Sequence, residues 1–145
     1  MFKRQLQAIL SLDSYTKRLF QGVYAMDQLP ARNNGAYVIN MDNHDEPGSH
    51  WVAVFVDNGA VEYFDSYGKA PTDSRLLHFL GPNFSYNSVT LQRQFTTVCG
   101  YFCLYFLLKR ARGVSASKIV HMLARTDSGF VVKNYVLSRY KPIFS

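Results

Sequence analysis

Short runs of apolar, β-branched and aromatic residues, separated by polar stretches, mark the first half of the chain. Two β-rich runs, "HWVAVFV" at 50–56 and "AVEYFD" at 60–65, are separated by the Asp-Asn-Gly stretch 57–59. A short turn of this composition between β-branched and aromatic runs is typical of an antiparallel hairpin. Shorter runs at 36–40 and 88–92 predict two further strands.

Helical spacing of apolar residues dominates the two ends of the chain. The polar and Gly-containing flanks of these segments provide the start and stop signals of helices. The predicted helices cover 2–12, 73–81, 99–112, 115–124 and 128–140.

The connecting segments are rich in Gly, Pro and Asn. Residues 20–36 predict a loop with one helical turn, and 81–87 predict a turn. An order of helix, strands, helix, strand and helices is typical of the α+β class. We therefore expect a small mixed or antiparallel sheet with a 50–65 hairpin, packed against a central helix at about 99–112 and flanking helices.

The composition indicates a single folded domain over residues 1–145. The chain is 48% apolar, which is enough for a core and excludes a disordered chain. Its net charge of +6 would permit non-specific DNA binding, although the densest cluster, "KRAR" at 109–112, lies where cations stabilise a helix end. We expect a monomer without a signal peptide or membrane span.

Cys99 and Cys103 are the two cysteines of the chain. On one helix face their Cβ atoms would lie about 5–6 Å apart, whereas a disulfide needs about 3.8 Å. Neither cysteine has a second Cys/His pair beside it, so we expect no metal site and no cofactor. Free thiols favour an intracellular location.

His50 and Asp65 are predicted to be neighbours, because His50 opens the first hairpin strand and Asp65 closes the second. An Asp beside a His can hold the imidazole tautomer and stabilise the imidazolium. Each residue taken singly also has a structural explanation. His50 could be a histidine that packs at the edge of a strand, and Asp65 could be a turn residue, because the sequence "DSYG" at 65–68 is typical of a turn.

Cys99 is either a small core residue or a nucleophile at the first turn of a helix. In that turn the helix dipole and a nearby His would favour the thiolate, and Gly100 would let a substrate approach closely. The backbone N–H of Cys99 and the amide of Gln92, or of its rival Gln94, could form an oxyanion hole.

The ordered residues His50-Trp51, Asp65 to Gly68, Gln92 and Cys99-Gly100 resemble the motif of the adenovirus-protease-like (adenain-like) cysteine peptidases. These peptidases are part of the wider superfamily of SUMO and ubiquitin-like-protein proteases. The resemblance covers residues 36–112 approximately. In addition, residues 22–30 resemble the corresponding segment of related proteases from viruses and large virus-like transposons.

The resemblance implies a papain-like cysteine protease architecture. It implies catalytic roles for Cys99, His50 and Asp65, with Gln92 in the oxyanion hole. The seven residues from Gln92 to Cys99 fit the adenovirus branch. Trp51 would either wall the substrate groove or pack in the core.

The sequence also departs from the adenovirus enzymes. Asp65 stands where they carry Glu, and the chain is shorter. Activation by a peptide or by DNA is therefore not carried over.

The resulting hypothesis is a cysteine endopeptidase that forms a thioacyl-enzyme. It would process viral or virus-like-element structural precursors in the host nucleus, the cytoplasm or the virion. Alternatives are a SUMO-type isopeptidase and a non-enzymatic basic nucleic-acid-binding module. A chymotrypsin-like fold would place Cys99 in a loop, and the apolar run after Cys99 is too long for that.

Overall fold

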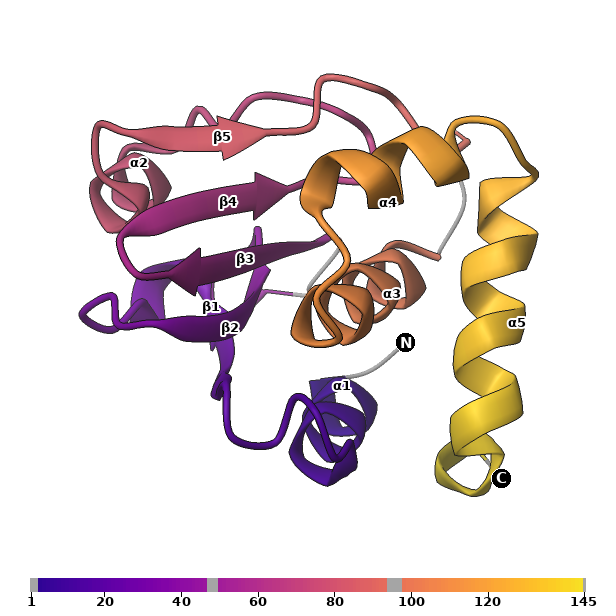
Figure 1. Cartoon of the computed structure of the whole chain (residues 1–145). Coiled ribbons are helices and arrows are strands. Elements are labelled where there is room, and N and C mark those ends of the chain that lie inside the picture. The colour runs from indigo at the N-terminus through magenta and orange to yellow at the C-terminus, as the bar shows by residue number, and fades with distance from the viewer. Residues whose placement is uncertain (1–2, 47–49, 94–97, 145) are drawn as a thin grey trace.

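The computed structural model describes residues 3–46, 50–93 and 98–144. The strands lie between Phe20 and Tyr86, and the described elements from Cys99 onward are helices (Figure 1). The elements are α1 (Lys3–Leu12), β1 (Phe20–Ala25), η1 (Met26–Gln28), β2 (Gly35–Asn40), β3 (Trp51–Asp57), β4 (Ala60–Phe64), α2 (Ser74–Leu80), β5 (Phe84–Tyr86), α3 (Cys99–Ala111), α4 (Ala116–Leu123), α5 (Ser128–Tyr140) and η2 (Lys141–Phe144).

The strands form one mixed sheet in the order β1-β2-β3-β4-β5. The central strands β2, β3 and β4 pair with one another in antiparallel fashion, whereas β1 runs parallel to β2 and β5 runs parallel to β4. This arrangement confirms the predicted α+β class and the hairpin. The hairpin turn consists of Asn58 and Gly59, both with positive φ, as a two-residue turn of this kind requires.

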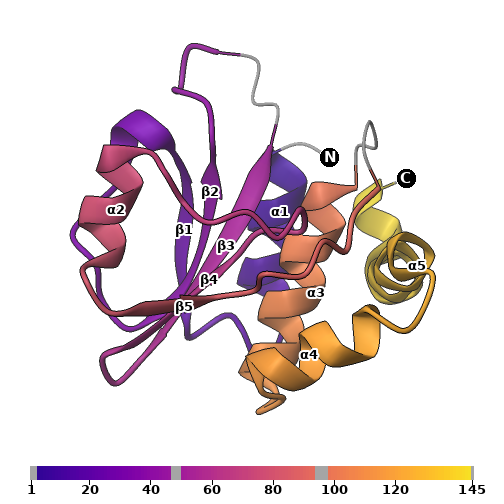
Figure 2. The ribbon, with the colours of Figure 1, turned by 90° about the horizontal axis from the view of Figure 1, so that it is seen from above.

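Helices cover both faces of the sheet. Figure 2 shows α1, α3, α4 and α5 on one side and α2 on the other. In the part of the chain that the structure describes, no helix combines the length and apolar character needed to cross a membrane.

The strand β3 is buried on both faces, which explains why its sequence is apolar without interruption. Alternate side chains enter two separate cores. Those of Trp51, Ala53 and Phe55 join the core under α3, and those of Val52, Val54 and Val56 join the core under α2.

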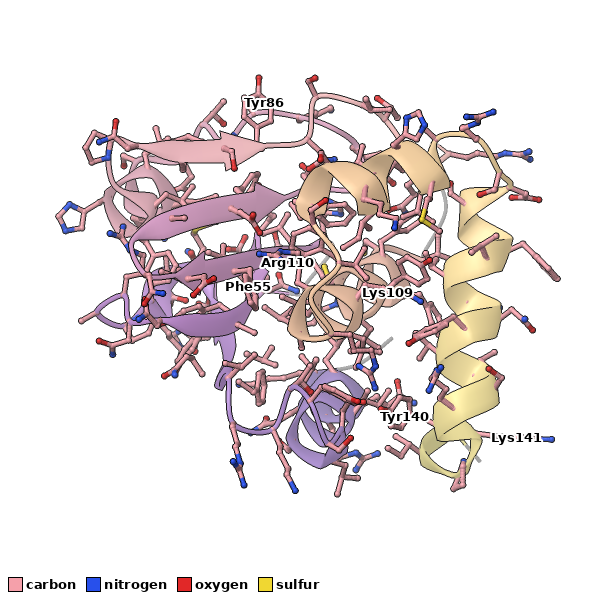
Figure 3. All side chains as sticks on the ribbon, viewed as in Figure 1. Phe55, Tyr86, Lys109, Arg110, Tyr140 and Lys141 are labelled. Carbon is pink, nitrogen blue, oxygen red and sulfur yellow. The ribbon has the colours of Figure 1, made fainter. Side chains whose placement is uncertain are left out.

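Helix α3 packs against the sheet through aromatic and cationic side chains. The ring of Phe106 stacks on that of Phe64 with centroids 4.5 Å apart. At the end of α3, the guanidinium of Arg110 lies 4.5 Å from the ring centroid of Phe55 and donates to Glu62 at 2.7 Å (Figure 3). These contacts fix the direction of α3, and therefore the position of its first residue, Cys99.

Two predictions about strands were wrong. Residues 20–25 form the edge strand β1 rather than a loop, because parallel pairing with β2 supplies hydrogen bonds that local sequence does not reveal. Residues 84–86 form β5 beside β4, whereas 88–92 form a loop. The loop backbone instead hydrogen-bonds to the turn that follows β4, through Leu91 and Gln92.

Candidate active site

His50 lies immediately before β3, where the backbone is already held by β2. Its carbonyl accepts a hydrogen bond from the backbone N–H of Met41 at 2.9 Å. The register of the hairpin pairs Ala53 with Phe64. One step further, Asp65 comes opposite Val52, two residues from His50, so the hairpin itself brings the two polar side chains to one end of the sheet.

His50 and Asp65 form a hydrogen-bonded pair. The Nε2 atom of His50 lies 2.8 Å from Oδ1 of Asp65, and the side chains are 17% and 7% exposed. The ring of Tyr67 packs over the imidazole with centroids 4.9 Å apart. Because Nε2 faces the carboxylate, Nδ1 is the ring nitrogen that remains for another partner.

The turn after β4 holds the carboxylate of Asp65 in place. The backbone N–H of Tyr67 donates to Oδ1 of Asp65 at 2.9 Å. The side chain of Asn87 clamps the Asp65 backbone from the other side, accepting from its N–H at 3.0 Å and donating to its carbonyl at 2.6 Å. The carboxylate therefore has little freedom to leave the imidazole.

Cys99 is the first residue of α3 and is 6% exposed. The preceding residue, Val98, provides no side-chain cap for the helix. The first N–H groups of α3 and the positive end of its dipole are therefore directed toward the thiol, which favours its anionic form.

The ionisation of Cys99 and His50 is coupled. Burial lowers the pKa of His50, but the hydrogen bonds to Asp65 and Cys99 outweigh burial and raise this pKa to about 9. Burial raises the pKa of the Cys99 thiol, yet hydrogen bonds from His50 and from the backbone N–H groups of Trp51 and Gly100 hold that pKa below its ordinary value. The two opposite shifts favour a thiolate–imidazolium pair over the neutral thiol and imidazole.

Cys103 lies one turn further along α3 and has a different environment. It is 1% exposed. Burial, with smaller contributions from Cys99 and Asp65, raises the pKa of its thiol well above the ordinary value. Both cysteines are free thiols, and the structure separates an ionisable one from an inert one.

Gln92 lies in the loop before α3 and is 2% exposed. Its Oε1 accepts a hydrogen bond from the hydroxyl of Ser66 at 2.5 Å, which identifies the other end of the amide as the donating nitrogen. The rival residue, Gln94, lies outside the described residues.

The substrate-binding roles expected for Trp51 and Gly100 stay predictions. The indole of Trp51 is 9% exposed and belongs to the core under α3. Gly100 is buried in the first turn of α3. The backbone N–H groups of both residues hydrogen-bond to Cys99, a contribution that the sequence does not indicate for Trp51.

Sequence reasoning missed Ser66, Tyr67 and Asn87 as parts of the site. The signal for the first two was the "DSYG" turn itself, which begins with the predicted acidic residue. Asn87 has no local signal, because its contact with Asp65 depends on the parallel pairing of β5 with β4. Among the described residues, no group of three His, Cys, Asp or Glu side chains is placed to share a metal ion.

No protein-family model matches the chain. Similarity to individual proteins is found instead. The chain is 32% identical over 99 residues to a putative thiol protease of Acanthamoeba polyphaga mimivirus, a match that covers 59% of this chain and 32% of that protein. It is 28% identical over 104 residues to a cysteine protease of African swine fever virus, covering 61% and 38% respectively. In another isolate of that virus the matching protein is called SUMO-1 cysteine protease.

The fold agrees with these sequence matches. The crystal structure of the African swine fever virus protease aligns with a TM-score of 0.58 at 21% identity, over 87% of this chain and 61% of the other. The chain is related to viral cysteine proteases. This relationship confirms the resemblance inferred from the sequence at the level of the superfamily and the fold.

The curated viral relatives are considerably longer than the chain itself. It spans about a third of the length of the curated viral proteases that it matches.

Proposed function

We propose that the chain is a cysteine peptidase that hydrolyses peptide bonds through a thioacyl-enzyme. The observation that carries the proposal is the placement of one imidazole, His50, between the carboxylate of Asp65 and the thiol of Cys99 at a helix N-terminus. This arrangement has the roles of a catalytic triad: nucleophile, base and orienting acid. The names of the viral relatives support the same activity.

Acylation begins when the Cys99 thiolate attacks the carbonyl carbon of the scissile bond. The carbonyl π electrons move to its oxygen, which becomes an oxyanion. The backbone N–H of Cys99 and the amide nitrogen of Gln92 donate to this oxyanion. As the tetrahedral intermediate collapses, the C–N bond breaks and the imidazolium of His50 protonates the leaving amine, leaving a thioester on Cys99.

Deacylation uses the same groups, with His50 acting first as a base instead of an acid. Neutral His50 takes a proton from a water molecule, which attacks the thioester carbonyl. The C–S bond then breaks, a carboxylic acid is released, and the thiolate–imidazolium pair is restored. Asp65 keeps the imidazole oriented during both steps.

The proposed substrates are structural precursor proteins of a virus or virus-like element, cleaved inside the host cell or in the virion. A second candidate is release of a ubiquitin-like modifier, which the name of one viral relative favours. We further propose that residues 1–145 form one protease domain that acts as a monomer.

Active-site labelling tests the proposed chemistry directly. Iodoacetamide should alkylate Cys99 at neutral pH much faster than Cys103, and His50→Ala should remove this advantage. Cys103→Ala serves as the matched control and should leave the fast reaction intact. Slow and equal alkylation of both thiols would contradict the peptidase assignment.

The substrate class is tested by comparing two sets of reactions. Fluorogenic SUMO and ubiquitin conjugates are compared with a capsid-type precursor, using Cys99→Ala as the inactive control. We expect cleavage of the precursor. Efficient release of SUMO would instead establish the second candidate. Salt-sensitive binding of nucleic acid without any turnover, unchanged in Cys99→Ala, would indicate a binding module.

A further inference from the structure

Ser66 is buried beside the proposed oxyanion donor and has no part in the triad. It is 1% exposed, and Gln92 is 2% exposed. Its hydroxyl donates to Oε1 of Gln92 at 2.5 Å, and its carbonyl accepts from the backbone N–H groups of Leu91 at 2.8 Å and Gln92 at 3.0 Å. Ser66 therefore holds both the backbone and the side chain of Gln92.

The side-chain contact decides which end of the amide faces the reaction. A glutamine amide has an accepting oxygen and a donating nitrogen of nearly the same shape, and only the nitrogen can stabilise an oxyanion. A hydroxyl that donates to Oε1 commits the oxygen to Ser66. The nitrogen is then the donating end of the side chain, on the side of the amide away from Ser66.

Ser66 directly follows Asp65 in the chain, so its contact with Gln92 also links the proposed oxyanion donor to the proposed orienting acid. The loop after β5 also supplies Asn87, which hydrogen-bonds to both the N–H and the carbonyl of Asp65. The orienting acid and the oxyanion donor are therefore held by one hydrogen-bonded unit, formed by the turn after β4 and the loop after β5.

Further contacts make this unit rigid. The hydroxyl of Thr90 donates to the carbonyl of Tyr67 at 2.9 Å. At the start of α5, the hydroxyl of Ser128 donates to the carbonyl of Leu91 at 2.6 Å. The loop that carries Gln92 is thus supported both by the sheet and by a helix.

We propose that Ser66 is a positioning residue for catalysis, which orients the amide of Gln92 so that its nitrogen donates to the oxyanion. This inference rests on the proposed function. It goes beyond it by assigning to Ser66 an effect on acyl transfer and no effect on the nucleophilicity of Cys99.

Two small reagents separate these effects. Acylation of Cys99 by p-nitrophenyl acetate passes through an oxyanion, whereas alkylation by iodoacetamide does not. Rates of both reactions are measured for the wild type and for Ser66→Ala, Ser66→Thr, Gln92→Ala and the double variant Ser66→Ala/Gln92→Ala. Neither reagent depends on knowing the natural substrate.

We expect Ser66→Ala to slow acylation about tenfold, less than the loss of the donor itself, and to change alkylation by less than about twofold. Ser66→Thr keeps the hydroxyl and should recover most of the acylation rate. The double variant should acylate no more slowly than Gln92→Ala, because the two residues act through one group.

Three results would overturn the inference, and they are distinguishable. If Gln92→Ala slows acylation and Ser66→Ala does not, the positioning role is wrong. If Ser66→Ala slows both reactions equally, the residue is merely structural. If Gln92→Ala leaves acylation unchanged, the oxyanion assignment in the proposed function fails, and the role of Ser66 fails with it.

A measurement on the wild type covers the case in which Ser66→Ala does not fold. The side-chain amide protons of Gln92 should exchange with water much more slowly than those of exposed glutamine side chains. Exchange as fast as that of a free amide would show that Ser66 does not hold the side chain.

Discussion

At the scale of single residues, reactivity is decided by what surrounds each of the two thiols. Cys99 has the imidazole of His50 and backbone N–H groups as partners, and these outweigh the effect of burial on its pKa. Cys103 is completely enclosed, and its thiol has a pKa raised by burial. Four positions along one helix therefore separate a thiol with a lowered pKa from a thiol with a raised pKa.

The paired charges of Cys99 and His50 predict a characteristic pH dependence. The thiolate forms as the pH rises through the lowered pKa of Cys99, so alkylation should be fast already at neutral pH. In His50→Ala the pKa of Cys99 rises, and alkylation at pH 7 should fall by about tenfold for each unit of that rise. Rates with iodoacetamide between pH 5 and about 10 measure both curves.

Peptide hydrolysis should decline at high pH for a different reason. The pKa of His50 is about 9, so the imidazolium that protonates the leaving amine is lost as the pH rises through that value. Alkylation does not need this proton and should stay fast there. Identical pH profiles for the wild type and His50→Ala would contradict the pairing of the two residues.

At the scale of elements, the site depends on how closely the turn after β4 approaches the loop after β5. Gly68 has φ of +71°, and a Cβ at this position would lie 2.6 Å from the backbone carbon and oxygen of Val89. The two backbones are therefore too close to admit any side chain between them. This contact keeps Asp65 and Gln92 in one unit.

Gly68→Ala should destabilise the protein by about 3 kcal/mol or more, because strain at a positive φ adds to a backbone clash. Gly59→Ala is the matched control. Gly59 also has a positive φ, of +86°, but a Cβ at this position would have no other atom within 4 Å, so about 1 kcal/mol is expected. Urea unfolding measures both values, and equal losses would show that the close approach does not matter.

At the scale of the whole molecule, Asp13 connects the two ends of the chain. Its carboxylate, 2% exposed, accepts from Arg112 after α3 at 2.7 Å and from the hydroxyl of Tyr140 at the end of α5. Tyr140 lies between α5 and α1 in Figure 3. The first helix and the last helix are thus joined to the core helix by one buried acid.

Burial raises the pKa of Asp13, but hydrogen bonds from Arg112, Tyr140 and Thr16 outweigh burial and lower it to about 2. A lowered pKa stabilises the folded state above the unfolded value of 3.8, and the contribution is lost as the pH falls through about 2. Asp13→Asn should therefore reduce the free energy of unfolding by about 2 kcal/mol at pH 7.

The difference between Asp13→Asn and the wild type should shrink as the pH is lowered from 4 toward 2 in urea unfolding experiments. Asp73→Asn is a suitable control, because Asp73 caps α2 and Asn caps helices equally well. Its effect should be about 0.5 kcal/mol or less. An effect of Asp13→Asn that does not change with pH would exclude the carboxylate as its cause.

The sequence by itself determined the parts of this protein that local patterns specify. The two β-rich runs and the Asn-Gly turn between them specify the hairpin, and the hairpin specifies that His50 and Asp65 lie at one end of the sheet. The apolar run from Cys99 onward specifies a buried helix with the thiol at its start. Each of these depends on residues close together in the chain.

Only the tertiary structure decided which strands lie at the edges and which groups support the site. The parallel pairs β1–β2 and β4–β5 join segments whose own sequences are short or polar, so no local periodicity marks them. The contacts of Ser66 with Gln92 and of Asn87 with Asp65 span 26 and 22 residues. Hydrogen bonds over such separations arise from the way the elements pack, and the residue types alone do not encode them.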